Sequence, residues 1–324
     1  MMATAALAFA ATFLVRRYTQ SIDIPNQRSS HDTPTPRGGG LAIVIVFYGS
    51  LLIACVLGYV ESNLLVALGA GLVVAGAGYA DDHKTLSARA RLAFHCVAAF
   101  LAVGWLDAWT TLDLGVTNLY WGIVGSLVAC AGLIWLTNLF NFMDGIDGIA
   151  ACEAIFVSLA FALLGASPLV CVLLAAGALG FLCLNWPPAR IFMGDVGSGF
   201  LGFIIGVLAL HAITTVSVSP WPLLIVVGLF VTDASLTLAH RALRGEKVWL
   251  AHRTHAYQWA ARRFGSHRAV LLSSIIINVA WLLPCAIAAY VFPRWAVVWT
   301  LVAYMPLIIL AWYFHAGLAE GKHV

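Results

Sequence analysis

The sequence predicts an all-α integral membrane protein that crosses the bilayer about eleven times. Of its 324 residues, 62% are hydrophobic and only 10% are charged, and the mean hydropathy is +0.95. A water-soluble fold cannot normally bury so much apolar surface, so a soluble enzyme is excluded. The apolar residues also form blocks of roughly 17 to 25, the length that a helix needs to cross a hydrocarbon layer of about 30 Å.

The predicted spans are joined mostly by short connections. The first block ends at Arg16 and Arg17 and lacks both a basic stretch ahead of it and a convincing cleavage site. This pattern favours a retained span over a cleaved signal peptide. The spans are predicted at residues 2–18, 39–60, 63–80, 91–109, 118–138, 148–165, 168–184, 199–215, 219–240, 269–291 and 295–316. We see no internal repeat or soluble domain, so we interpret 1–324 as one membrane domain.

The basic residues predict the orientation, because Lys and Arg in short loops are retained on the cytoplasmic side during insertion. With eleven spans, sixteen of the seventeen Lys and Arg residues fall on one face, and only Arg294 lies opposite. The sequence therefore predicts an N-terminus outside and a cytoplasmic C-terminus.

Five aspartates mark the predicted cytoplasmic ends of the spans. Carboxylates at membrane depth are costly and tend to be functional. They lie in "GYADDHKTLSARARL" (Asp81 and Asp82), "NLFNFMDGIDGIA" (Asp144 and Asp147) and "NWPPARIFMGDVGSGF" (Asp195). Three segments distant in sequence thus converge on one face, and the expected catalytic loops are residues 19–38, 81–91, 138–148, 185–198 and 241–268.

The residue types favour a magnesium-bound phosphorylated substrate. Short Asp side chains beside glycines suit Mg²⁺, which prefers oxygen ligands and is often shared with substrate phosphates, and Mn²⁺ accepts the same ligands. If the segment is helical, Asp144 and Asp147 share a face. Arg28 and Arg37, with His31, supply further anion contacts in "PNQRSSHDTPTPRGGG".

The histidine pair in the last loop and the aspartate inside a predicted span each have two interpretations. His252 and His255 are spaced to approach a phosphate or metal on one helical face, but solvated histidines fit the spacing equally well. Asp233, inside a predicted span, is either a site residue or the partner of Arg241 in an ion pair. The alternative function is a secondary transporter that uses intramembrane carboxylates, and its carboxylates should line the midplane rather than one face. A binding or scaffold protein leaves the clustered motifs unexplained.

In order, "RSSHDTPTPRGGG", "DDHKTLS", "NLFNFMDGIDGIA", "NWPPARIFMGDVGS" and "HRTHAYQ" resemble motifs of the polyprenyl-phosphate N-acetylhexosamine-1-phosphate transferases, the family of WecA, MraY and WbpL-like enzymes. The resemblance implies transfer of a sugar-1-phosphate from a UDP-N-acetylhexosamine to undecaprenyl phosphate, with Mg²⁺ and release of UMP. It implies a membrane lipid and a nucleotide sugar as partners, no nucleic acid, and a homodimer as an assembly to consider.

The resemblance also implies roles for single residues. Asp195 takes the position of the Mg²⁺ ligand, and Phe192 that of an aromatic residue associated with uracil stacking. It implies catalytic roles for Asp81 and Asp82 of the aspartate-rich motif and for Asp144 and Asp147 of "NxxDGxDG". It implies substrate binding by Asn141 of the same motif, by Asn185 in the nucleotide-binding segment, and by His252, Arg253 and His255 in the last loop. That loop has Tyr257 and Gln258 where many relatives have a denser His cluster. This form is closer to the branch that initiates the O-antigen of lipopolysaccharide or other surface polysaccharides. The donor sugar in that branch is N-acetylglucosamine or a 6-deoxy sugar such as N-acetylfucosamine or N-acetylquinovosamine.

Overall fold

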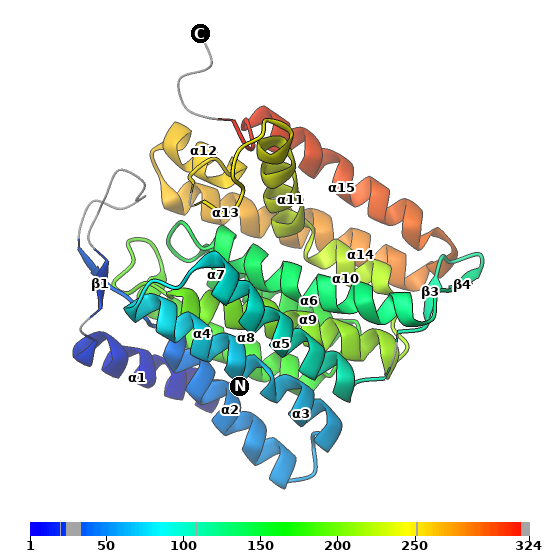
Figure 1. Cartoon of the computed structure of the whole chain (residues 1–324), viewed down its shortest axis with the longest axis horizontal. Helices are drawn as coiled ribbons and strands as arrows, with labels where there is room; N and C mark the ends of the chain where they lie inside the picture. The colour runs from blue at the N-terminus through cyan, green and yellow to red at the C-terminus, as the bar shows by residue number, and fades with distance from the viewer. Residues whose placement is uncertain (20, 24–33, 108, 251, 319–324) are drawn as a thin grey trace.

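The protein is a bundle of helices with two short β-hairpins, as a computed structural model shows (Figure 1). The structure describes residues 1–19, 21–23, 34–107, 109–250 and 252–318. The helices are α1 Met2–Tyr18, α2 Gly40–Val56, α3 Ser62–Gly69, α4 Gly71–His83, α5 Ala88–Trp105, α6 Ile123–Met143, α7 Ile149–Leu163, α8 Pro168–Asn185, α9 Asp195–Thr214, α10 Pro220–Val226, α11 Gly228–Leu243, α12 Ala256–Phe264, α13 His267–Ile277, α14 Leu283–Val291 and α15 Ala296–Tyr313.

Short irregular elements connect these helices. A π-helical turn, Asn278–Leu282, joins α13 to α14, and a 3₁₀ turn, Pro293–Trp295, precedes α15. The strands pair antiparallel, β1 (Ile22–Asp23) with β2 (Thr35–Pro36) and β3 (Thr111–Asp113) with β4 (Asn118–Tyr120). The two hairpins lie at opposite ends of the bundle (Figure 1).

Six described helical segments are long and apolar enough to cross a membrane, or seven if α10 and α11, which meet at a bend of 75°, form one broken span. These segments match seven of the predicted spans. The other four predicted spans coincide with α1, α2, α5 and α7, which do not reach the same length and hydropathy. The protein is therefore a multi-pass membrane protein, and the count of eleven and the orientation of the termini stay predictions.

Several predicted boundaries differ from those of the helices, and two of the differences are at the starts of α6 and α5. Residues 118–120 form strand β4, and the helix predicted over 118–138 begins at Ile123 instead. The helix predicted over 91–109 begins three residues earlier, at Ala88, because the hydroxyl of Ser87 accepts a hydrogen bond from the Ala90 amide and caps it. A hydropathy pattern detects neither the short strand β4 nor the cap at Ser87.

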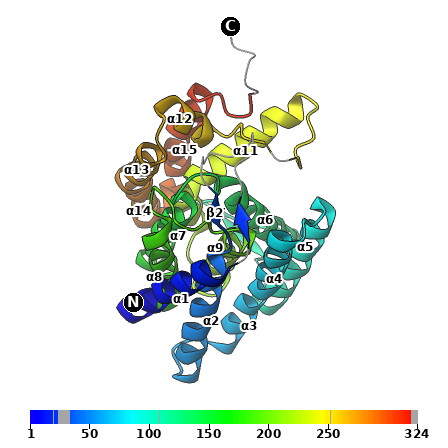
Figure 2. The ribbon, with the colours of Figure 1, turned by 90° about the vertical axis from the view of Figure 1, so that its left-hand side faces the viewer.

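Helix α9 is the centre of the fold, and nearly all of its side chains are buried. It packs against α2, α4 and α6, with α7 also in contact. Figure 2 views the end of the bundle where α4, α6 and α8 finish and α5, α7 and α9 begin, with β2 near its middle. The expected loops at 81–91, 138–148 and 185–198 meet at this end, as does the described part of 19–38.

Candidate active site

Glycines allow α2 and α4 to approach the start of α9 closely. A methyl group on Gly78 would overlap the backbone carbonyl of Asp195, and one on Gly40 would overlap the backbone of Gly197. No larger residue fits at either contact without a shift of the backbone. The glycines of the motif "GDVGSG" and of α4 thus place the carboxylates at the end of α4 beside Asp195.

Asp82 caps the first turn of α9. Its carboxylate oxygens accept hydrogen bonds from the backbone amides of Asp195 (3.0 Å) and Val196 (3.2 Å). The chain enters the helix through Gly194, whose φ of +75° favours glycine. The Asp82 side chain is only 1% exposed, so it holds the segment that carries Asp195 and is not open to a substrate.

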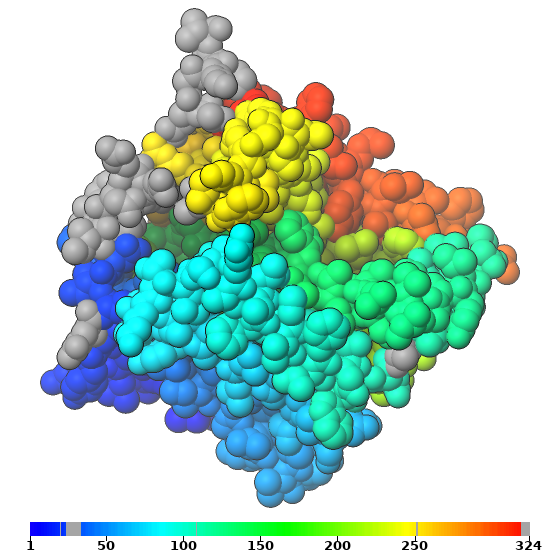
Figure 3. Space-filling view, viewed as in Figure 1, coloured from blue at the N-terminus to red at the C-terminus, as the bar shows by residue number. Residues whose placement is uncertain are grey.

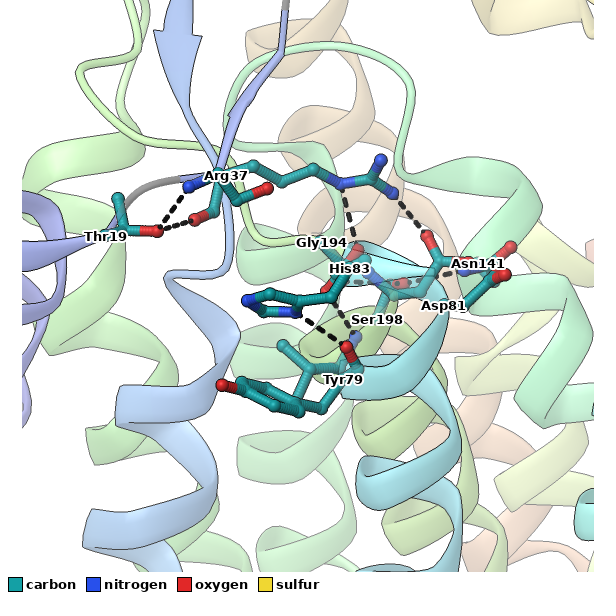
Figure 4. A network of polar contacts seen from close by, with 12 residues as sticks. Thr19, Arg37, Tyr79, Asp81, His83, Asn141, Gly194 and Ser198 are labelled. Atoms are coloured by element: carbon teal, nitrogen blue, oxygen red, sulfur yellow. Dashed lines mark hydrogen bonds and ion pairs between the residues drawn. The ribbon is translucent and has the colours of Figure 1, made fainter. Parts of the chain in front are cut away.

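Arg37 joins two of these carboxylates. Its Nε lies 3.0 Å from Asp82 Oδ1, and its Nη2 donates to Asp195 Oδ1 at 2.6 Å. The residue follows β2, and its carbonyl accepts a hydrogen bond from Thr19. Figure 4 shows its side chain extending toward the end of α4 and Gly194. The surrounding carboxylates raise the pKa of Arg37 against the effect of its burial, so the guanidinium is a permanent cation at the site.

Arg91 joins Asp195 to the other aspartate of the pair. Its Nη1 lies 2.8 Å from Asp81 Oδ2 and 3.4 Å from Asp195 Oδ2. Asp81 also accepts the Leu86 amide at 2.5 Å. In the sequence, Arg91 counts only among the basic residues that predict the orientation. Its place at the end of the expected loop 81–91, shortly after the Asp pair, is the signal that could have identified it, and the structure places it on α5.

Asp144 lies in the loop after α6, near Arg37, Asp195 and Asp82. Burial raises the pKa of this carboxyl to about 7, and the neighbouring carboxylates add to the increase while Arg37 opposes it. A bound cation would stabilise the ionised form. Asn141, one turn earlier on α6, donates to the hydroxyl of Ser198 (3.1 Å), a residue that sequence reasoning missed.

Asp147 and Asn185 brace the loops behind this centre. Residues 144–148 are not helical, so the condition under which Asp144 and Asp147 would share a face is not met. Asp147 accepts the Ala189 amide at 3.0 Å and lies 3.4 Å from His267 Nδ1. Asn185 accepts the Gly148 amide at 2.9 Å and donates to the Ile191 carbonyl. These contacts lock the start of α7 to the segment that leads to α9.

Phe192 holds the same segment against the N-terminal loop. Its amide donates to the Pro36 carbonyl, and its carbonyl accepts the Gly39 amide. The residue as a whole is half-buried. Arg28 and His31 lie outside the described residues.

The last loop is organised by Asp233. This carboxylate lies 3.1 Å from His255 Nδ1 and accepts the Ala256 and Tyr257 amides at 3.0 and 2.9 Å. Arg241 pairs with Glu246 at 3.0 Å, so of the two alternatives for Asp233, the ion pair with Arg241 is not formed. His255 is buried, at 2% exposed, and with Asp233 it holds the start of α12.

His252 and His255 precede α12 and do not lie on a helical face, but their rings stack with centroids 4.9 Å apart. Burial lowers the pKa of His252 to about 3, and the nearby His255 and Arg241 add to the decrease, so this ring is neutral. Its Nδ1 lies 3.0 Å from the Thr254 hydroxyl. Arg253 is half-exposed beside it. Figure 3 shows a hollow between the yellow segment near residue 250 and the cyan segment near residue 85.

The residues at this end suit a cation that is shared with a substrate. Among the described residues, no three His, Cys, Asp or Glu side chains form a cluster that could hold a metal ion alone. Mg²⁺ is commonly held by one or two carboxylates together with substrate phosphates. Asp195, with its side chain 17% exposed, and the nearby Asp144 provide such carboxylates.

Comparison with known proteins identifies the family. The family model described as glycosyl transferase family 4 matches residues 64–213, which include the aspartates of all three motifs. The decaprenyl-phosphate N-acetylglucosaminephosphotransferase of Mycobacterium leprae is 31% identical over 78% of this chain and 73% of its own length.

Two further relatives differ in their named substrates. A probable undecaprenyl-phosphate N-acetylglucosaminyl 1-phosphate transferase of Bacillus subtilis is 29% identical over 80% of the chain and 74% of its own length. A phospho-N-acetylmuramoyl-pentapeptide-transferase of Moorella thermoacetica is 35% identical over 55% of the chain and 61% of its own length. The chain therefore belongs to the polyprenyl-phosphate N-acetylhexosamine-1-phosphate transferase family.

Proposed function

We propose that the protein transfers a sugar-1-phosphate from a UDP-N-acetylhexosamine to undecaprenyl phosphate and releases UMP. The observation that supports this most strongly is the meeting of Asp81, Asp82 and Asp195 with two arginines at one end of the bundle. Such a site can neutralise a diphosphate, and it lies where helices end, within reach of both a soluble donor and a lipid acceptor. The names of the relatives support the same class of acceptor.

The proposed reaction is a direct displacement. An oxygen of the acceptor phosphate attacks the β-phosphorus of the donor, a new P–O bond forms there, and the bond to the α-phosphate oxygen breaks so that UMP leaves. A phosphate monoester has a second pKa of about 6 and is mostly a dianion near neutral pH, so a general base adds little. Arg37 and Arg91 orient the phosphates of the two substrates and offset their negative charge.

The proposed cofactor is Mg²⁺, with Mn²⁺ as a substitute. Asp195 and Asp144 are the residues that would hold it, while Asp82 positions Asp195 through the backbone. When bound, such an ion polarises the phosphoryl oxygens and stabilises the departing phosphate.

The proposed donor carries a single N-acetylhexosamine. Relatives named for N-acetylglucosamine cover about four fifths of the chain, whereas the muramoyl-pentapeptide relative covers 55%. N-acetylglucosamine and the 6-deoxy sugars N-acetylfucosamine and N-acetylquinovosamine remain the candidates, with initiation of O-antigen or another surface polysaccharide as the role.

The proposed location is the bacterial inner membrane with the site on the cytoplasmic face, because nucleotide sugars are charged and do not cross a bilayer. A cysteine at Ser87 in a cysteine-free background should react with an impermeant thiol reagent only after the membrane is opened, and one at Ser217 in intact spheroplasts. The opposite labelling pattern would contradict this orientation.

A homodimer is the assembly we propose to test by cross-linking.

A secondary transporter fits the site less well. Its carboxylates should lie near the midplane, whereas the carboxylates of the site belong to the end of α4, the residue after α6 and the start of α9. The test of the proposed transferase function is incubation of the purified protein with Mg²⁺, undecaprenyl phosphate and a panel of UDP-sugars. We expect a lipid-linked product with at least one N-acetylhexosamine donor, and absence of product with every donor would contradict the proposal.

A further inference from the structure

A small polar cavity adjoins Asp195 on the side away from Arg37. It has a volume of about 20 Å³ and lies between α4, α5, α6 and α9, with Arg91, His95, Asn138 and Asp195 in its lining. A cavity needs at least about 10–15 Å³ to hold one water. This one therefore accepts a single water-sized group, such as one oxygen of a phosphate.

Asn138 fixes the tautomer of His95. The Asn138 amide nitrogen donates to the Ile134 carbonyl at 2.7 Å and lies 3.2 Å from His95 Nδ1. An amide nitrogen only donates, so Nδ1 must be the acceptor and the ring proton sits on Nε2. Among the described residues, the structure gives Nε2 no hydrogen-bonding partner. His95 thus offers the cavity a neutral N–H donor.

The two arginines divide the site into two anion positions. Arg37 binds Asp195 Oδ1, and Arg91 binds Asp195 Oδ2. Arg37 comes from the N-terminal loop, but Arg91 and His95 lie one turn apart on α5. The outer side of α5 is apolar and exposed, with Val97 at 51% and Phe100 at 62%. Helix α5 therefore borders the lipid, which favours the Arg91 position for the lipid acceptor.

We propose that His95 Nε2 and Arg91 bind a phosphate oxygen of the polyprenyl phosphate acceptor, and that Asn138 is a positioning residue that keeps the proton of His95 on Nε2. The inference rests on the proposed transferase function, and it deepens that function by separating the acceptor phosphate from the donor diphosphate.

The first test varies UDP-sugar and undecaprenyl phosphate separately in steady-state kinetics of the full-length protein. His95→Leu should raise the acceptor KM about ten-fold or more, the usual loss for a hydrogen bond to a charged group, and change the donor KM less than about two-fold. His95→Gln, which restores an N–H donor, should recover most of the loss. Phe94→Leu, on the exposed side of α5, is the matched control and should behave as wild type.

The second test measures whether Asn138 sets the tautomer of His95. The ¹⁵N shifts of His95 should show the Nε2–H tautomer in the wild type and a mixture in Asn138→Leu, with a parallel rise in the acceptor KM. An acceptor KM unchanged in His95→Leu, or a donor KM raised equally, would overturn the inference while leaving the transferase function standing.

A binding measurement separates the two claims. Binding of dodecyl phosphate to the protein without donor should weaken in His95→Leu, whereas binding of UMP should not. If the wild type transfers no sugar but shows this difference, the transferase proposal fails and the phosphate site stands. If dodecyl phosphate binds equally to both proteins, the cavity holds only water and the inference is wrong.

Discussion

The carboxylate of Asp82 accepts the backbone amide of Asp195 at 3.0 Å, across 113 residues of sequence. This bond makes the end of α4 the cap of α9, and it fixes the direction in which the Asp195 side chain leaves the helix. The two aspartates therefore have different roles. The Asp82 side chain is almost fully buried and caps α9, whereas the Asp195 side chain is partly exposed between two arginines.

Asp82→Ala should lower the stability of the protein, because it removes a helix cap and leaves two buried amides unpaired. Loss of a cap typically costs about 0.5–2 kcal/mol, so we expect a lower Tm in detergent and a smaller loss in Asp82→Asn. His83→Ala, which changes an exposed neighbour, is the control. A Tm for Asp82→Ala equal to that of the control would show that the cap is not stabilising.

Asp195→Asn should reduce turnover at least about a hundred-fold while leaving a folded protein, because an amide lacks the charge that holds a metal beside a diphosphate. Wild-type turnover should likewise stop in excess EDTA and return with Mg²⁺ or Mn²⁺. Rates are measured after monodispersity in detergent is confirmed for the variant. Full activity in EDTA would remove the metal from the account, and near-normal activity of the variant would remove Asp195 from its site.

The rate at saturating acceptor should depend on the ionisation of Asp144. Its pKa is raised to about 7, so the carboxyl is about half protonated at pH 7 and becomes ionised as the pH rises. If the ionised form supports metal binding, kcat/KM for the donor rises with pH through this region and levels above about pH 8, and more Mg²⁺ shifts the inflection to lower pH. The residual activity of Asp144→Asn should lack this inflection, and its persistence there would assign it to another group.

Phe192→Ala should weaken binding of the donor more than it lowers the turnover rate of the bound donor, because a uracil contact lies remote from the reacting phosphorus. Stacking of an aromatic side chain on a base contributes about 1–3 kcal/mol, or roughly five- to 150-fold in affinity. The measurement is the Kd of the UDP-sugar by calorimetry, with Phe192→Tyr as the control that keeps the ring. An unchanged Kd in the alanine variant would rule out stacking at this position.

The sequence predicted the meeting of Asp81, Asp82 and Asp195 because the order of the spans and the distribution of Lys and Arg place their loops on one face. It did not predict which atoms meet. The bridge from Arg91 to Asp195 spans two helices, and the contact depends on glycines such as Gly78 that allow α4 and α9 to approach. Neither the ion pair nor the close approach of the two helices leaves a periodic pattern in the sequence.

Local backbone geometry explains the remaining differences. The spacing of Asp144 and Asp147 fits a helix, but a helix there would turn both carboxylates the same way. Instead the turn that ends at Gly148, with φ of +77°, sends Asp147 to Ala189 and His267. Asp233 finds His255 rather than Arg241 because α12 begins against α11, a contact that hydropathy cannot reveal.

The most direct test of the central claim follows the β-phosphate of the donor. UDP-N-acetylglucosamine and the candidate 6-deoxy donors, labelled with ³²P at the β-phosphate, are incubated with the purified protein, Mg²⁺ and undecaprenyl phosphate, and the products are partitioned between organic and aqueous phases. Displacement at the β-phosphorus predicts ³²P in the lipid product and unlabelled UMP in equal amount. Label that appears as UDP while unlabelled sugar enters the lipid would mean attack at the sugar carbon, and it would contradict the phosphotransfer that this site is proposed to perform.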